Sequence, residues 1–183
     1  MKEFWDFDEN KNFITIMVNN IPYKVLEKYP NYFDSVKILI YLRYIIYLIC
    51  VYLSVNIFKY SSKDQIAIKC FLDIHFNKKS PYYLSEMQIG NQFNGLNKPR
   101  NLYKSNQPIL GKDGRDRARY RHIFLTLRHN NGSFKTINSI IDLLIHEVTH
   151  TMCNHIRWRE DDHGEDFIYY ENLLIDIYNK IKK

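Results

Sequence analysis

The sequence predicts an α+β fold in which several helices pack with a small sheet. Three observations predict it: a hydrophobic run over residues 34–58, alternating polar and apolar residues at 122–128, and two amphipathic segments near the C-terminal end. The 183 residues suit one domain, 1–183, with its own core. Apolar residues make up 45% of the chain and charged residues 25%, a balance that excludes a disordered protein.

Residues 1–33 are predicted to be an irregular or short-stranded lead-in. Its one plausible strand is Phe13–Val18, and Pro22 and Pro30 interrupt the residues after it. We therefore expect little regular structure before residue 34.

Residues 34–58 form the most hydrophobic segment, and Asp34-Ser35 supplies a good helix N-cap. Two interpretations compete. About 20 apolar residues span a bilayer, so residues 38–55 nearly qualify as a membrane anchor. The tyrosine hydroxyls in this run need hydrogen-bonding partners, which favours a buried helix. We expect the buried helix and keep the anchor as the alternative.

Residues 64–76 have loosely helical apolar spacing and predict a second helix. Residues 77–119 hold most of the glycines and prolines and predict a long loop with little regular structure. Between Lys98 and Arg128, nine basic residues stand against two acidic ones, a net charge of +7. We expect a solvated surface loop here, and contact with nucleic acid through its phosphates is the alternative.

The alternation at 122–128 predicts a half-buried strand whose apolar side chains share one face. Asn130-Asn131-Gly132 turns the chain, and Thr136 or Asn138 caps a helix that runs to about Asn154. The last helix spans about 165–182. The apolar stripes of these two helices are Ile137, Ile141, Leu144, Val148 and Met152, then Phe167, Tyr170, Leu174, Ile177 and Ile181.

The helix before Asn154 contains the motif H-E-x-x-H at His146, Glu147 and His150. Residues four apart lie about 40° from each other on a helix, so both imidazoles can reach one Zn²⁺. Zinc lowers the pKa of its water toward about 7. Glu147 can then act as the general base when that water attacks a carbonyl. The motif therefore predicts a zinc peptidase, a hydrolase acting on protein or peptide substrates.

The third metal ligand has several candidates. His155 lies nine residues beyond His146, about 180° around a continuing helix, and would point away. His163 follows a polar connector and opens the last helix, so it can be aimed back at the ion. His163 is therefore favoured. The alternative ligands are His155, if a sharp turn brings it back, and four carboxylates, Asp161, Asp162, Glu165 and Glu171. Asp161 or Asp162 could also support a ligand histidine.

The spacing His146-Glu147-x-x-His150 followed by His163-Gly164-Glu165-Asp166-Phe167 resembles the signature of the SprT-like and WLM peptidases. The segment 121–183 is similar to WLM-type metallopeptidases of large DNA viruses, with weaker similarity over 23–53. The resemblance implies a zincin-like fold whose catalytic core is the strand–helix–helix unit 121–183. It also implies that the strand borders the substrate cleft, that His163 is the third ligand, and that Phe167 packs beneath the site. The resemblance further implies that the substrates are proteins attached to DNA. The connector 155–162 is longer than in the family.

Three cysteines without a C-x-x-C pair argue against disulfides and against a cysteine zinc site. They favour a reducing, intracellular compartment, and no signal peptide is expected in the first thirty residues. A different functional class is a non-catalytic binding module whose zinc is structural. Such a site is closed by four protein ligands, for example with both His155 and His163 on the metal.

Overall fold

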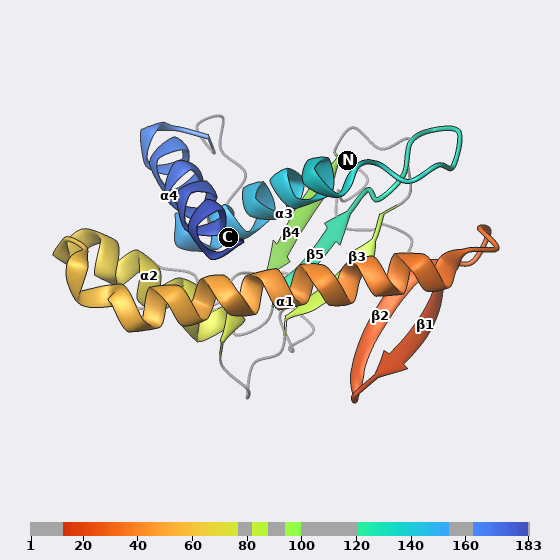
Figure 1. Cartoon of the computed structure of the whole chain (residues 1–183), viewed down its shortest axis with the longest axis horizontal. Helices are drawn as coiled ribbons and strands as arrows, with labels where there is room; N and C mark the ends of the chain where they lie inside the picture. The colour runs from red at the N-terminus through yellow and green to blue at the C-terminus, as the bar shows by residue number, and fades with distance from the viewer. Residues whose placement is uncertain (1–12, 77–81, 88–93, 100–120, 154–162, 183) are drawn as a thin grey trace, which may run out of the picture.

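The computed structural model describes residues 13–76, 82–87, 94–99, 121–153 and 163–182 (Figure 1). Across these residues, four α-helices pack with a mixed five-stranded sheet, which confirms the predicted α+β class. The elements in chain order are β1 Phe13–Val18, β2 Ile21–Leu26, α1 Tyr32–Asn56, the short 3₁₀ helix η1 Ile57–Lys59, α2 Ser62–His75, β3 Tyr83–Glu86, β4 Gly95–Pro99, β5 Arg121–Leu125, α3 Ile137–Met152 and α4 Glu165–Ile181.

Residues 13–26 form an antiparallel hairpin, so the lead-in contains a second strand, β2, that was not predicted. The strand predicted at Phe13–Val18 is β1, residue for residue. Asn19 and Asn20 have φ of 50° and 61°, the left-handed conformation that a tight two-residue hairpin turn requires. Pro22 is tolerated in β2 because the next strand, β3, meets β2 at Lys24, beyond the proline.

The sheet has the order β1-β2-β3-β5-β4. β2, β3 and β5 run parallel, whereas β4 is antiparallel to β5 and ends the sheet. The prediction of a long loop over 77–119 is therefore wrong for β3 and β4. Both strands are short, and β4 begins at a glycine and ends at a proline. Pairing with β5 makes them strands, and local sequence does not record that pairing.

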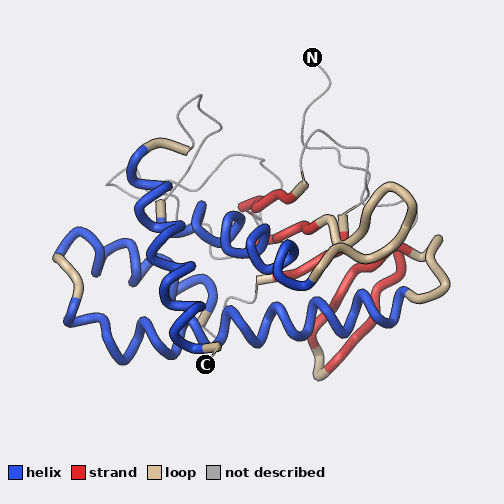
Figure 2. The backbone as a smooth tube through the Cα atoms, turned by 45° about the horizontal axis from the view of Figure 1, so that its top comes forward, coloured by secondary structure: helices blue, strands red, loops and turns tan. Residues whose placement is uncertain are grey.

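The hydrophobic segment forms α1, which packs on β2 and β3 and against α2 and α4 (Figures 1 and 2). Arg43 of α1 donates to the carbonyl oxygen of Tyr82 at 2.6 Å, and its guanidinium lies 4.2 Å from the Tyr82 ring. The guanidinium of Arg43 therefore binds another residue of the protein. Among the described residues, 32–59 is the one helical segment with the length and hydropathy to cross a membrane, and 39% of its most apolar window is buried. The buried side chains of α1 lie on one face, and its other face exposes apolar and tyrosine side chains such as Ile40, Tyr44 and Val55.

α3 lies over β4 and β5, and α4 packs on α3 and α1. The side chain of Thr136 caps α3 by accepting a hydrogen bond from the amide of Ser139 at 3.3 Å, as predicted. The predicted stripes are buried except at their ends, where Ile137 is exposed and Ile181 is half-buried. Helix α2 matches the segment predicted at 64–76 to within two residues.

Arg128 closes one end of the core, where it is 1% exposed. Its Nε donates to Glu86 Oε1 at 2.9 Å, and a terminal nitrogen donates to Ser35 Oγ at 3.0 Å. Arg121 is also buried. These two arginines therefore do not belong to a surface basic stretch, and the rest of that stretch, 100–120, lies outside the described residues.

Candidate metal centre

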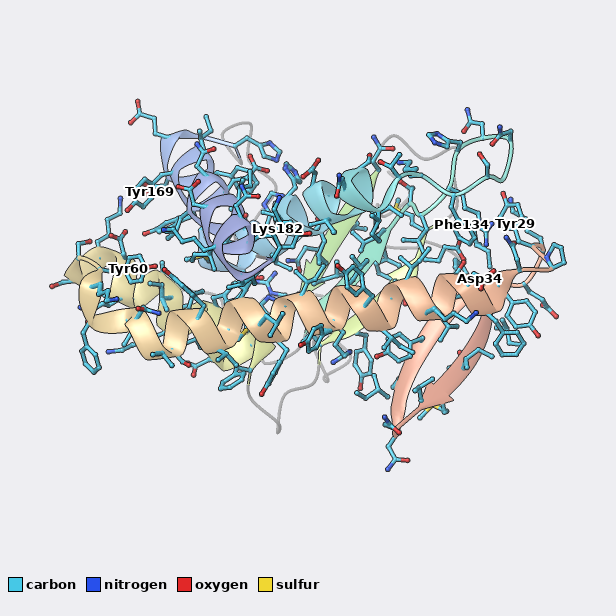
Figure 3. The ribbon with its side chains drawn as sticks, viewed as in Figure 1. Tyr29, Asp34, Tyr60, Phe134, Tyr169 and Lys182 are labelled. Carbon is cyan, nitrogen blue, oxygen red and sulfur yellow. The ribbon has the colours of Figure 1, made fainter. Side chains whose placement is uncertain are left out.

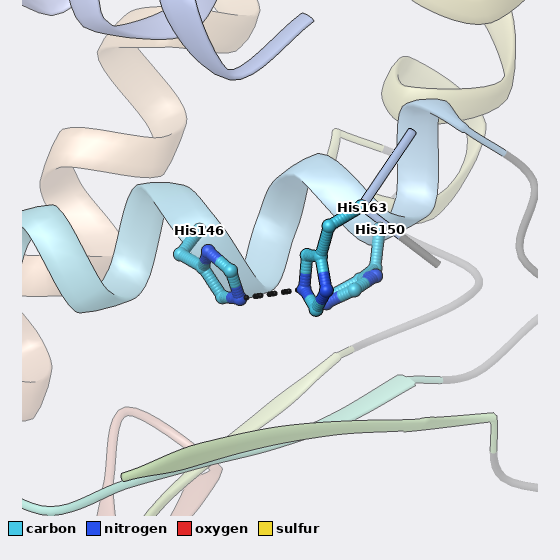
Figure 4. A group of neighbouring side chains, drawn as sticks. All are labelled: His146, His150 and His163. Carbon is cyan, nitrogen blue, oxygen red and sulfur yellow. Dashed lines mark hydrogen bonds between the residues drawn. The ribbon is translucent and has the colours of Figure 1, made fainter. Parts of the chain in front are cut away.

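Three imidazoles meet beside α3 (Figure 4). His146 and His150 project from successive turns of α3, and His163 lies just before α4. One potential ligand atom of each ring lies within 4.8 Å of those of the other two. His146 Nε2 and His163 Nε2 are 3.2 Å apart. The structure thus brings the predicted third histidine to the helical pair.

Imidazole nitrogens are ligands of zinc and of other divalent transition metals. Nitrogens bound to one tetrahedral zinc at about 2.0–2.1 Å from the metal lie about 3.3 Å from each other. The 3.2 Å separation of the His146 and His163 nitrogens agrees with that value. Across the described residues, these histidines form the one group of three or more possible ligand side chains. Cys153 follows α3 outside this group, and burial raises the pKa of its thiol to about 12.

Phe167 forms the base of the cluster. Its side chain is 2% exposed. Its ring centroid lies 5.0 Å from that of His146 and 4.7 Å from those of His150 and His163. This is the position that the family resemblance implies for Phe167. A buried ring touching all three imidazoles limits the directions in which they can turn.

Glu171 of α4 supports His146 from the side away from the cluster. Its Oε1 lies 2.9 Å from His146 Nδ1, while His146 Nε2 is the atom that approaches His163. A carboxylate on Nδ1 holds that nitrogen as the proton donor and leaves the Nε2 lone pair for a metal. Glu171 was one candidate for the third ligand, and its contact with Nδ1 suits a supporting residue instead. Asp161 and Asp162, the predicted supports, lie outside the described residues, as does His155.

Glu147 points from α3 toward the sheet and is 5% exposed. Burial raises the pKa of its carboxyl from 4.5 to about 8. The neighbouring position on β4 is Gly95, where a β-carbon would lie 2.8 Å from Glu147 Cγ and 2.9 Å from its Cδ. The missing side chain at Gly95 therefore leaves the space that the Glu147 carboxylate occupies.

Asn97, two residues further along β4, ties the strand to the backbone of α3. Its Nδ2 donates to the carbonyl oxygen of Glu147 at 2.5 Å and lies 3.2 Å from Thr151 Oγ1. The Thr151 hydroxyl also meets His75 Nε2 at 3.2 Å. Burial lowers the pKa of His75 to about 3, so this ring is neutral at physiological pH. Hydrogen bonds among the neutral side chains of Asn97, Thr151 and His75 thus hold the turn of α3 that carries Glu147.

Three contributions to this site were not predicted from sequence: Gly95, Asn97 and the supporting contact of Glu171. The first two lie on β4, within the region predicted as a loop. A signal for Glu171 existed, because His163, Phe167 and Glu171 follow one another at steps of four residues and so share one helix face.

No protein-family model, no curated protein and no solved structure matches the chain. The family resemblance of residues 121–183 therefore stays a prediction. What the protein does has to be argued from the chemistry of His146, Glu147, His150 and His163.

Proposed function

We propose that this protein is a zinc-dependent peptidase of the zincin type, in which His146, His150 and His163 hold Zn²⁺ and Glu147 is the general base. The observation that carries the proposal is the convergence of the three imidazoles within 4.8 Å, with the Glu147 carboxylate on the same helix. Three histidines leave a fourth position for water or substrate, as catalytic zinc sites do, whereas structural sites use four protein ligands. Among the described residues, this donor set favours an enzyme over a structural zinc module.

Zinc, when bound, supplies a Lewis acid that activates water and polarises the scissile carbonyl. The chain's own residues handle the protons. A Glu147 carboxylate oxygen takes a proton from the attacking water and later gives it to the leaving amine nitrogen. In the metal-free protein, burial raises the pKa of this carboxyl to about 8. A bound cation lowers that pKa and keeps Glu147 ionised before the reaction.

The resemblance implies that the strand before α3, which is β5, borders the substrate cleft, but β5 lies between β3 and β4 in the sheet. We therefore place an extended peptide beside β4. β4 pairs with β5 along one side and is the last strand of the sheet among the described residues. Gly95 of this strand adjoins Glu147. A peptide that adds to the sheet beside β4 would make backbone hydrogen bonds without regard to its sequence. Its carbonyl groups would then pass next to the general base.

The test combines metal analysis with proteolysis of an unfolded protein substrate. We expect one zinc per chain and cleavage that stops when a chelator removes the metal. Glu147→Gln should keep the zinc and lower kcat/KM by about 10²-fold or more, since general acid–base catalysis supplies about that much. Asp142→Asn is the matched control, because Asp142 is an exposed carboxylate on the same helix. Cleavage by Glu147→Gln at the wild-type rate would refute the proposal.

A further inference from the structure

α4 supplies three side chains to the candidate centre: His163 just before its first turn, then Phe167 and Glu171. All three depend on how α4 is rotated about its axis, because each residue advances the helix by about 100°. If α4 were rotated about its axis by the angle of one residue, about 100°, His163 would point away from α3. Some contact must therefore fix α4 in the orientation that the centre requires.

Asp64, in the first turn of α2, makes such a contact. It is 8% exposed, and its two carboxylate oxygens accept hydrogen bonds from two adjacent residues of α4. The hydroxyl of Tyr169 lies 3.3 Å from Oδ2, and that of Tyr170 lies 3.3 Å from Oδ1. In Figure 3, Tyr169 reaches from α4 toward the end of the molecule where Tyr60 and the start of α2 lie.

Asp64 is itself held in place. Ser61 donates its hydroxyl hydrogen to Asp64 Oδ2 at 2.7 Å, and Ser61 Oγ accepts from the Asp64 amide at 3.2 Å. The adjacent residue, Lys63, pairs with Asp166 of α4 at 2.6 Å. That pair is exposed and contributes little to stability, whereas the buried Asp64 carboxylate is shielded from water. Burial and the Asp64 charge raise the pKa of Tyr170, so its hydroxyl remains a donor.

The α4 residues that contact Asp64 and Lys63 are sequence neighbours of the α4 residues that contact the candidate centre. Tyr170 lies directly before Glu171, and Asp166 lies directly before Phe167. Hydrogen bonds are directional, so two of them to one fixed carboxylate set the rotation of α4, which apolar packing alone would leave less defined. Asp64 also stabilises the start of α2, where it pairs with the N-cap residue Ser61. Its bonds to Tyr169 and Tyr170 come in addition to that cap and reach a different helix.

We propose that Asp64 is a positioning residue for the metal centre, which fixes α4 through Tyr169 and Tyr170 so that His163 completes the three-histidine set. The proposal rests on the proposed function, because it requires that the centre binds a metal. It assigns to α2 a role in metal affinity, although no residue of α2 belongs to the three imidazoles of the centre.

The test measures metal affinity and not activity. Dissociation constants for Co²⁺ and Zn²⁺ are obtained by competition with a chromophoric chelator, together with the visible spectrum of bound Co²⁺. The double variant Tyr169→Phe/Tyr170→Phe removes both hydroxyls and keeps the rings, and we expect about tenfold weaker binding, as for other residues that orient ligands indirectly. Asp64→Asn should also weaken metal binding.

A second background distinguishes positioning from a general loss of stability. In His163→Ala, the tyrosine substitutions should cause a clearly smaller loss of affinity, because only the part that acts through Glu171 on His146 remains. Glu86→Gln is the control, since it breaks a buried ion pair at the other end of the core. It should lower the free energy of unfolding and leave the metal dissociation constant of the folded protein unchanged.

Each outcome of these measurements either supports or overturns the positioning role of Asp64. Unchanged affinity in the double variant, or the same loss in both backgrounds, would overturn the positioning role while the proposed function stands. If the wild-type protein bound neither metal, the proposed function and this inference would fail together. If Asp64→Asn did not fold, the double tyrosine variant would give the answer alone.

Discussion

Gly95 and Glu147 are in direct contact across the boundary between the sheet and α3. A β-carbon at Gly95 would lie closer to the Glu147 side chain than real β-carbons approach their neighbours, at 2.8 Å from Cγ. The edge of the sheet therefore determines where the candidate general base can lie. Asn97, on the same face of β4, holds the backbone of the same helix turn.

Gly95→Ala should displace the Glu147 carboxylate, because the new methyl group would overlap it. We expect kcat/KM for an unfolded protein substrate to fall by at least about tenfold, as proton transfer depends on hydrogen-bond reach. Zinc stoichiometry should stay at the wild-type value, because the three histidines lie elsewhere. The two quantities are measured on the same preparation. Wild-type kcat/KM in Gly95→Ala would show that this contact does not position the base.

The Glu147 carboxyl should make the metal-free protein less stable as the pH rises from about 4.5 to 8. The folded-state pKa of Glu147 is raised to about 8 by burial. A group with a raised pKa contributes stability that is present below its unfolded pKa and is lost as the pH rises through the folded value. Urea unfolding with a chelator present, at pH 5 and pH 8, measures the difference. Glu147→Gln should reduce it.

His75 acts in the opposite sense, because its pKa is lowered to about 3 and the stability of the folded protein falls as the pH drops below 6.5. The comparison of wild type with Glu147→Gln isolates the carboxyl, since both proteins contain His75. An identical pH dependence in the two would contradict the assignment of a buried, protonated Glu147 in the metal-free state.

Glu171→Gln should weaken zinc binding by about tenfold or more, because the residue holds His146 Nδ1 at 2.9 Å. Competition with a chelator gives the dissociation constant, and thermal unfolding of the metal-free protein shows whether the fold is intact. Asp176→Asn, an exposed change on the same helix, is the control. Equal affinities in all three proteins would show that Glu171 does not support the metal ligand His146.

Arg128→Met should destabilise the protein by about 3–5 kcal/mol, because it leaves the Glu86 carboxylate buried without its cation. An exposed change such as Lys59→Met should stay within about 0.5 kcal/mol. Urea unfolding of both variants gives the values. If Arg128→Met were as mild as the exposed change, the Glu86–Arg128 ion pair would not stabilise the core.

The long periodic segments were predictable from sequence because their own residues determine them. α1, α3 and α4 carry apolar patterns over four or more turns, and the Thr136 cap of α3 could be identified in advance. β2, β3 and β4 could not. They are four to six residues long, two of them contain proline, and their strand state comes from pairing with distant residues.

The candidate site also combines residues that were predictable from local sequence with residues that were not. His146, Glu147 and His150 follow from helix spacing, and His163 follows from its place at the start of the last helix. Gly95 and Asp64 are distant in sequence from these residues and belong to no motif. Their contacts with Glu147 and with α4 arise only when the sheet edge and the start of α2 are brought to the site.

The most direct test of the central claim is an equilibrium zinc titration of the wild-type protein and of His163→Ala. We predict one zinc per wild-type chain and at least about a hundredfold weaker binding in the variant, because one of three protein ligands is lost. Binding by His163→Ala as tight as that of the wild type would contradict the claim that the three imidazoles share one metal ion.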